Sequence, residues 1–447
     1  MKKSANCGLF SRNGSCFAAA PGIYYRANPH INIQRKGILK MMKKHLVHAL
    51  AAALLLTAGC CCPSEKTAAA PREDVKLLLP DKIYAVPGVE TNIYFANAVR
   101  VINPANYVFE VKSPRGRCDE KRWRYTPSEK DKPGVFKLHL RVLGNSGVLA
   151  EKTVTVEVAP ADAGKGGKLS MLIVGDSLTN ATVYPQRILD LFKKPGNPET
   201  RQIGSHAGSG RPVKAGGVAH EGYGGWTWAR FSEQWQDDAR FAKLKTPRER
   251  LYARSQFLKV ENGKKELDIK GYFARMNNGE APDIIIFQLG VNDIFPATDE
   301  DVDARIVRIF GYMDKLLAAV REAAPDAAIG VGLTTPGAAS QDAFGKNYKS
   351  RHSAWQYKKN QHRLVEAMMR KFEKANPYKV EIVPVYLNLD CENNFPTVTE
   401  AVNQDNGKKI VRQNNGVHPA PAGYRQIGDT FYCWMKSVLA RKQAKAK

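Results

Sequence analysis

The 447-residue sequence predicts an α/β protein with a parallel sheet covered by helices on both faces, preceded by a small all-β domain. Two observations predict this. From Leu169 onward, continuous apolar runs of strand length alternate with longer segments of helical periodicity. Between about Val75 and Pro160, short stretches of strand-forming residues are separated by turns rich in proline, glycine and asparagine.

The composition is that of a folded globular protein, with 43% hydrophobic and 25% charged residues. A net charge of +25 indicates either an anionic partner, such as an acidic polysaccharide or phospholipid headgroups, or a generally basic surface. No long basic run with interleaved aromatic residues occurs, so we expect no nucleic-acid partner.

An export signal is predicted at residues 41–59. Lys43 and Lys44 are followed by a short run rich in alanine and leucine, then by Ala-Gly and Cys60. A cysteine at this position resembles the bacterial lipobox, which implies that Cys60 is lipidated and anchors the mature protein to the cell envelope. A plain secretory signal is the alternative. Translation is expected to begin at Met41 or Met42, so residues 1–40 would be an over-long start.

The predicted domain boundaries follow changes in composition. Residues 60–74 are expected to be a tether, 75–160 a β-sandwich of immunoglobulin-like size, and 161–168 a glycine-rich linker. The sandwich would be a spacer, a packing partner or a sugar-binding module. Its expected strands are 83–86, 91–95, 107–111, 136–142 and 153–158.

The α/β domain is predicted at residues 169–441, followed by a basic tail at 442–447. Cys118, Cys391 and Cys433 are the only cysteines in the expected folded part, too few for a disulfide framework and without metal-binding spacing. An exported protein could still form a Cys391–Cys433 bridge. The expected strands are 170–175, 283–289, 327–333 and 378–386, and the expected helices are 302–323, 354–375 and 422–439.

Four short motifs fall at strand ends or in loops, where the side chains of an α/β protein can converge. In chain order they are Gly175-Asp176-Ser177-Leu178, a glycine-rich stretch from His220 to Thr227, Gly290-Val291-Asn292-Asp293, and Asn415-Gly416-Val417-His418-Pro419.

These motifs contain the groups that ester hydrolysis needs. Ser177 could attack a carbonyl carbon while His418 accepts its proton. Asn292 could donate its amide, and Gly225 and Ser177 their backbone N–H groups, to the developing oxyanion. Each motif alone is weak evidence, but their joint occurrence at strand ends is more specific.

In this order the four motifs resemble those of SGNH (GDSL-type) hydrolases, over about Lys168 to Val438. The resemblance implies a flavodoxin-like three-layer α/β/α fold and a serine esterase that needs no cofactor and no metal. It also implies that Ser177 is the nucleophile and an oxyanion donor, that Gly225 and Asn292 complete the oxyanion hole, and that His418 is the base.

One position departs from the family pattern. The family usually has Asp three residues before the catalytic histidine, and this chain has Asn415. Asn415 could orient His418, Asp390 or Asp405 could supply the acid, or the enzyme could work with a Ser-His dyad. Loss of activity is the fourth possibility.

Three functions remain open from the sequence. The leading one is an exported, lipid-anchored esterase that removes acetyl or other short acyl groups from carbohydrate. The second is an acyl hydrolase acting on lipids, and the third is a glycan-binding protein on a decayed hydrolase scaffold. Four aromatic residues would either pack in the core or line a sugar-binding surface: Trp226, Trp228, Trp355 and Tyr357. The sequence does not indicate an oligomeric state.

Overall fold

The computed structural model describes residues 74–446, which belong to a single contact unit. The expected leader, export signal, lipidated Cys60 and nearly all of the tether therefore lie outside the described residues. Within those residues, no helix is both long and apolar enough to span a membrane.

The C-terminal part is built on a parallel sheet with the strand order β11-β10-β15-β16-β17. The short strand β12 pairs with the last residues of β10, after the stretch of β10 that pairs with β11. The first strand, β10, lies inside the sheet, so later strands are added on both sides of it. The central strands are wholly apolar or nearly so, because both faces of the sheet are buried. Their bounds are β10 (Lys168–Gly175), β11 (Glu199–Ile203), β12 (Glu221–Gly222), β15 (Ile284–Gln288), β16 (Ala328–Gly332) and β17 (Val380–Val383).

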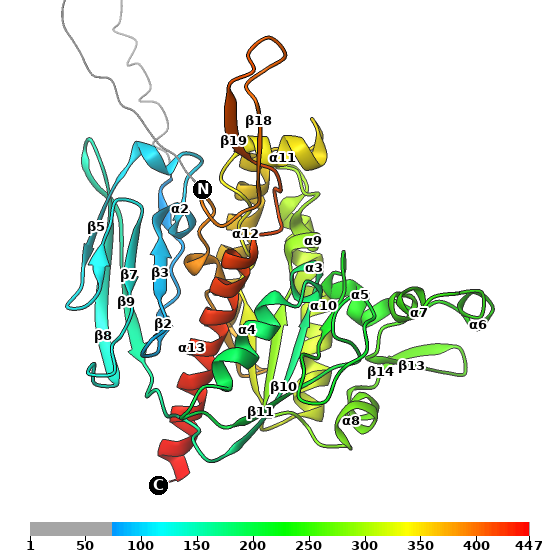
Figure 1. Ribbon diagram of the computed structural model, residues 1–447. Coiled ribbons are helices and arrows are strands. Elements are labelled where there is room, and N and C mark those ends of the chain that lie inside the picture. The colour runs from blue at the N-terminus through cyan, green and yellow to red at the C-terminus, as the bar shows by residue number, and fades with distance from the viewer. Residues whose placement is uncertain (1–73, 447) are drawn as a thin grey trace, which may run out of the picture. The chain divides into compact units, whose positions relative to one another are not determined.

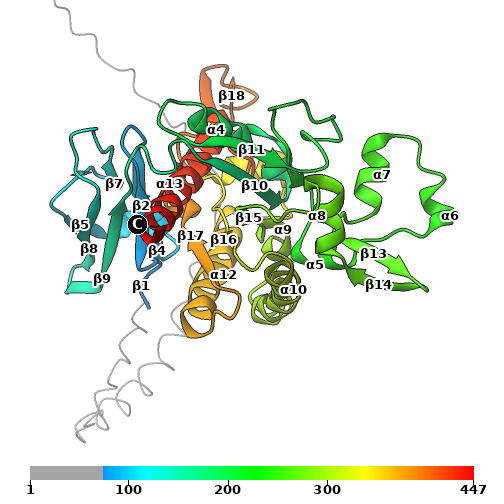
Figure 2. The ribbon, with the colours of Figure 1, turned by 90° about the horizontal axis from the view of Figure 1, so that it is seen from below.

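Helices cover both faces of this sheet, as Figure 2 shows, with α4 (Val183–Phe192) and α13 (Pro421–Ala446) on one face and α10 (Val302–Ala323) and α12 (Ala354–Lys374) on the other. A Cβ at Gly330 in β16 would lie 2.6 Å from the Trp434 ring of α13, so this glycine lets the helix approach closely. The predicted three-layer α/β arrangement is confirmed. Residues of the predicted basic tail continue α13 as far as Ala446, as expected for a stretch of lysines and alanines.

The N-terminal part contains the predicted strands in two main sheets, with orders β2-β9-β8-β5 and β3-β7-β6. The β2–β9 pair is parallel, and the other pairs in these sheets are antiparallel. The immunoglobulin-like assignment stays a prediction. The strand bounds are β1 (Lys76–Leu77), β2 (Lys82–Ala85), β3 (Thr91–Tyr94), β4 (Val99–Arg100), β5 (Val108–Lys112), β6 (Arg117–Cys118), β7 (Arg122–Tyr125), β8 (Gly134–Gly144) and β9 (Gly147–Val158).

The N-terminal β part packs directly on the α/β part. Figure 1 places α13 beside β2, and buried residues of the two parts belong to one hydrophobic core cluster. The suggested Cys391–Cys433 bridge is wrong. Both cysteines are free, since the Cys391 thiol contacts Asn97 Oδ1 and Leu389 O, whereas Cys433 is buried on α13.

Two excursions from the α/β part were not predicted. The inserted arm, residues 234–267, contains α6 (Asp238–Phe241), α7 (Pro247–Ala253) and a hairpin of β13 (Leu258–Glu261) with β14 (Lys264–Leu267). A second hairpin, β18 (Thr397–Ala401) with β19 (Lys409–Gln413), precedes the fourth motif. The remaining helices are α2 (Phe95–Ala98), α3 (Ser177–Asn180), α5 (Trp228–Glu233), α8 (Ile269–Asn277), α9 (Val291–Ile294) and α11 (Gln341–Tyr348), with 3-10 turns η1 (Pro104–Asn106) and η2 (Val385–Asn388).

Candidate active site

Ser177 lies at the carboxyl end of the central strand β10, as the first residue of α3. The turn between them is tight, because a Cβ at Gly175 would lie 1.9 Å from Thr179 Oγ1 and 2.9 Å from the Gln288 carbonyl oxygen. Asp176 caps α3 by accepting a 2.9 Å hydrogen bond from the Leu178 N–H. The turn therefore fixes the direction in which Ser177 leaves the strand.

His418 meets Ser177 from 241 residues further along the chain. Its Nε2 lies 2.8 Å from Ser177 Oγ, within hydrogen-bond distance. Burial lowers the pKa of His418 below its usual value. A neutral imidazole with a free Nε2 lone pair at this position can accept the hydroxyl proton.

Asn415 holds the backbone of the histidine and not its ring. Its Oδ1 accepts hydrogen bonds from the N–H groups of Val417 (3.2 Å) and His418 (2.9 Å). Among residues 74–446, no protein group hydrogen-bonds to Nδ1 of His418. The expected contact between Asn415 and the imidazole is therefore not what the structure contains.

The two alternative acids lie elsewhere. Asp390 accepts hydrogen bonds from its own loop and from Tyr94 of the N-terminal part. Asp405 lies in the exposed turn between β18 and β19, where its N–H donates to Asn403 Oδ1. Neither carboxylate is hydrogen-bonded to His418 within the described residues.

The three groups expected to bind the oxyanion are each able to donate a further hydrogen bond. The N–H groups of Ser177 and Gly225 have no hydrogen-bond partner in the part of the chain that the structure describes. Gly225 is exposed and has a φ of +76°, a conformation that favours glycine. Asn292, on α9 after β15, donates one amide N–H to the Trp226 carbonyl (3.0 Å), which orients the amide and leaves its second N–H free.

Tyr252 of the inserted arm is a contact that the sequence analysis missed. Its hydroxyl accepts a 2.8 Å hydrogen bond from the N–H of Gly224, the residue before Gly225. Its ring packs edge-on against Tyr223, with centroids 5.4 Å apart. No short motif marks this residue, which lies in α7 behind an exposed first turn that carries two arginines.

Two buried carboxyl groups lie next to candidate site residues in the sequence: Asp176 precedes Ser177, and Asp293 follows Asn292. Burial raises the pKa of Asp176 to about 7, with the charge of Asp293 as a further cause. Burial likewise raises the pKa of Asp293 to about 7, while Asp293 Oδ1 accepts from the Trp228 N–H at 3.1 Å. Asp293 thus ties the third motif to Trp228, the second residue after Trp226 of the second motif, while the Asp176 hydrogen bond stays within the first motif.

Three of the four aromatic candidates are buried and one is exposed. Trp226, Trp228 and Tyr357 are at most 2% exposed and pack in the core, whereas Trp355 is 49% exposed, with the Lys359 ammonium 4.4 Å from its ring centroid. His220 and Glu221 are also buried and hold the second motif in shape. In residues 74–446, no group of three or more His, Cys, Asp or Glu side chains could hold a metal ion.

The fold and these motifs define an ester hydrolase. A model of the GDSL-like lipase/acylhydrolase family matches residues 173–426, more than half of the chain. The chain belongs to this family, which confirms the resemblance to SGNH hydrolases. A comparison with curated proteins gave no match.

Several solved structures are similar to this chain. A Clostridium thermocellum family 3 carbohydrate esterase is 16% identical over 61% of this chain and 97% of its own, with a TM-score of 0.36. A family 3 carbohydrate esterase from Talaromyces cellulolyticus is 17% identical over 61% and 98%, with a TM-score of 0.32. An acetyl xylan esterase, AlAXEase, is 13% identical over 59% and 98%, with a TM-score of 0.31.

Proposed function

We propose that the protein is an exported serine esterase that removes acetyl or other short acyl groups from carbohydrate. The observation that carries the mechanism is the 2.8 Å approach of His418 Nε2 to Ser177 Oγ. Export and anchoring through Cys60 are supported by the lipobox-like sequence alone.

In the proposed mechanism, Ser177 Oγ attacks the ester carbonyl carbon while His418 Nε2 accepts the hydroxyl proton. The N–H groups of Ser177 and Gly225 and the amide of Asn292 bind the oxygen that becomes negative. His418 then returns the proton to the leaving sugar hydroxyl, and an acyl group remains on Ser177. Water, deprotonated by the same imidazole, releases the acid and restores the serine.

The surroundings of Ser177 support a polar substrate over a long acyl chain. The large exposed hydrophobic side chains among the described residues all lie outside the four motifs. At the end of α3, polar Asn180 accepts a 2.7 Å hydrogen bond at Oδ1 from the N–H of Ser209. Trp355 is the one exposed residue among the four aromatic candidates, and an exposed aromatic ring is able to stack on a sugar.

The test compares the wild type with Ser177→Ala on p-nitrophenyl esters of increasing chain length and then on acetylated xylan. We expect Ser177→Ala to lose at least about 10³-fold in kcat, and the wild type to prefer acetate and release acetate from the glycan. Equal turnover by both proteins would contradict the mechanism. A preference for long chains would favour a lipid substrate, and glycan binding without hydrolysis would favour a decayed scaffold.

A further inference from the structure

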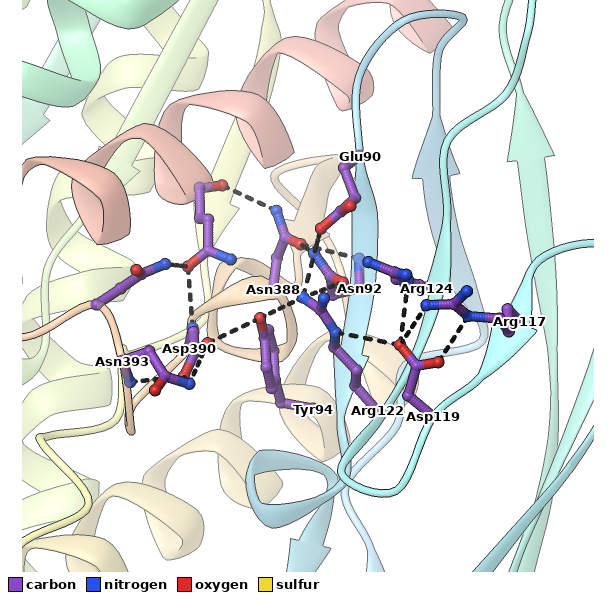
Figure 3. A network of polar contacts seen from close by, with 12 residues as sticks. Glu90, Asn92, Tyr94, Arg117, Asp119, Arg122, Arg124, Asn388, Asp390 and Asn393 are labelled. Carbon is purple, nitrogen blue, oxygen red and sulfur yellow. Dashed lines mark hydrogen bonds and ion pairs between the residues drawn. The ribbon is translucent and has the colours of Figure 1, made fainter. Parts of the chain in front are cut away.

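Several of the polar contacts between the N-terminal β part and the α/β part fall on one short stretch, residues 388–394, here named the support segment. Figure 3 shows this network from close by. Asn92 donates both its backbone N–H and its side-chain amide to Asn388 Oδ1, at 2.8 and 2.9 Å. Tyr94 donates its hydroxyl to Asp390 Oδ2 at 3.2 Å, and Asn97 donates its amide to the Leu389 carbonyl at 2.8 Å.

Arg122 holds the Tyr94 side chain in position. Arg122 Nη1 donates to the Tyr94 hydroxyl at 2.7 Å, and the guanidinium carbon lies 5.3 Å from the centroid of the Tyr94 ring. The Arg122 guanidinium in turn lies 3.8 Å from Asp119, which also pairs with Arg124 at 3.1 Å (Figure 3). The hydroxyl therefore accepts from a cation and donates to a carboxylate, an arrangement in which each bond strengthens the other.

Asp390 organises the support segment through hydrogen bonds. Asp390 Oδ1 accepts hydrogen bonds from the N–H groups of Glu392 (3.0 Å) and Asn393 (2.9 Å). The Asp390 N–H and the Asn394 amide both donate to Gln426 Oε1 on α13, each at 2.9 Å. A change at Asp390 is therefore transmitted to the whole segment.

The same segment holds both ends of the loop that carries the histidine. Before His418, Gln413 donates its amide to the carbonyls of Cys391 and Glu392, each at 2.8 Å. After His418, the Ala420 N–H donates to the Asn394 carbonyl at 2.9 Å. The support segment therefore fixes the backbone on either side of the fourth motif.

The position of this backbone matters more than usual here. The His418 ring has its Nε2 contact with Ser177 and no hydrogen bond at Nδ1 from the residues that the structure describes. Because no second hydrogen bond holds the ring, the position of the ring depends on the position of the backbone that carries it. A misplacement of about 1 Å can cost about a hundredfold in rate.

We propose that the N-terminal β part positions His418 toward Ser177, through the Tyr94–Asp390 contact and the support segment. Tyr94 is then a positioning residue, since it acts through other groups and touches no reacting atom. The inference rests on the proposed Ser177–His418 mechanism and gives the β part a role in catalysis in place of a spacer's.

The experiment uses the full chain with Tyr94→Phe, which removes only the hydroxyl. The matched control is Tyr125→Phe on the neighbouring strand β7, where the hydroxyl accepts from Arg115 at 3.4 Å and has no bond to the support segment. Two rate constants are measured per titrated active site: kcat for p-nitrophenyl acetate, and phosphorylation of Ser177 by a dialkyl p-nitrophenyl phosphate, which releases p-nitrophenolate. The second reports on the Ser-His pair and involves no sugar site.

For Tyr94→Phe we expect both rate constants to fall about tenfold, with KM within about twofold, while Tyr125→Phe stays within about twofold of the wild type. A role in stability alone would lower the melting temperature and leave both rate constants per active site unchanged. That result, or equal rates in the two variants, would overturn the proposal.

A second variant covers the case in which Tyr94→Phe does not fold. Arg122→Gln keeps the Tyr94 hydroxyl but removes the cation that holds it, and we expect a fall of about threefold in both rate constants. Unchanged rates in a folded Arg122→Gln protein would overturn the proposal. If Ser177→Ala turns over the ester as fast as the wild type, the proposed function fails; if only the Tyr94 and Arg122 results are negative, this inference alone fails.

Discussion

Replacing Asn415 by alanine tests how the histidine is held. Asn415 Oδ1 accepts two backbone hydrogen bonds, from Val417 at 3.2 Å and from His418 at 2.9 Å. Each such bond contributes about 1 kcal/mol, so Asn415→Ala removes about 2 kcal/mol from the ordering of this loop. If the whole loss falls on the transition state, kcat drops roughly thirtyfold.

The assay is kcat for p-nitrophenyl acetate, with thermal melting of each variant alongside. The matched variant is Asn415→Asp, whose carboxylate can accept the same two N–H groups, so we expect its kcat to stay within about threefold of the wild type. In a Ser-His-Asp triad the corresponding exchange is worth about 10⁴ in kcat. A gain of a hundredfold or more for Asn415→Asp, or an unchanged kcat for Asn415→Ala, would refute the reasoning.

The site leads to three further predictions. Burial lowers the pKa of His418, which must be neutral to accept a proton, so the acidic limb of kcat/KM should be centred below pH 6.5; a limb centred above pH 6.5 would contradict this. Tyr252→Phe removes the acceptor for the Gly224 N–H and should lower kcat about tenfold with little change in KM; an unchanged kcat would exclude a role in shaping the oxyanion loop. Because burial raises the pKa of Asp176 and Asp293 to about 7, the folded state binds protons between about pH 4 and pH 7 that the unfolded state has released. This contribution lowers the free energy of unfolding as pH rises through that range, and Asp293→Asn should make the fall smaller. Urea titrations at pH 5 and pH 8 measure the fall in the wild type and in the variant, and an equal fall in both proteins would disprove the prediction.

Much of the fold could be predicted because its signals are local. The helix at residues 302–323 was predicted at the bounds of α10, since its apolar residues recur with helical spacing. The apolar strand at residues 283–289 contains β15 for the same kind of reason. The edge strand β11, with the sequence Glu-Thr-Arg-Gln-Ile, carries no such run and was missed, because only its pairing with β10 makes it a strand.

The site could be predicted as a set of residues but not as a set of contacts. Ser177, Asn292 and His418 follow from the rule that strand-end loops converge, and the structure brings Ser177 and His418 together. The role of Asn415 could not be predicted, because its side chain can bond either to a ring or to a nearby N–H, and the loop conformation decides between them. Tyr252 reaches Gly224 only through the tertiary fold of the inserted arm.

The same contacts indicate which groups replace the two roles of a triad carboxylate in the proposed mechanism. A triad carboxylate does two things: it orients the imidazole and it stabilises the imidazolium that forms in the transition state. Here orientation can come from the backbone, which Asn415 holds from within the loop and Gln413 and Ala420 hold at its two ends. No carboxylate among residues 74–446 is bonded to His418, and burial already disfavours its charged form. The stabilisation of charge must then fall more heavily on the oxyanion side, so removal of the Asn292 amide should cost this enzyme more than it costs a hydrolase with a complete triad.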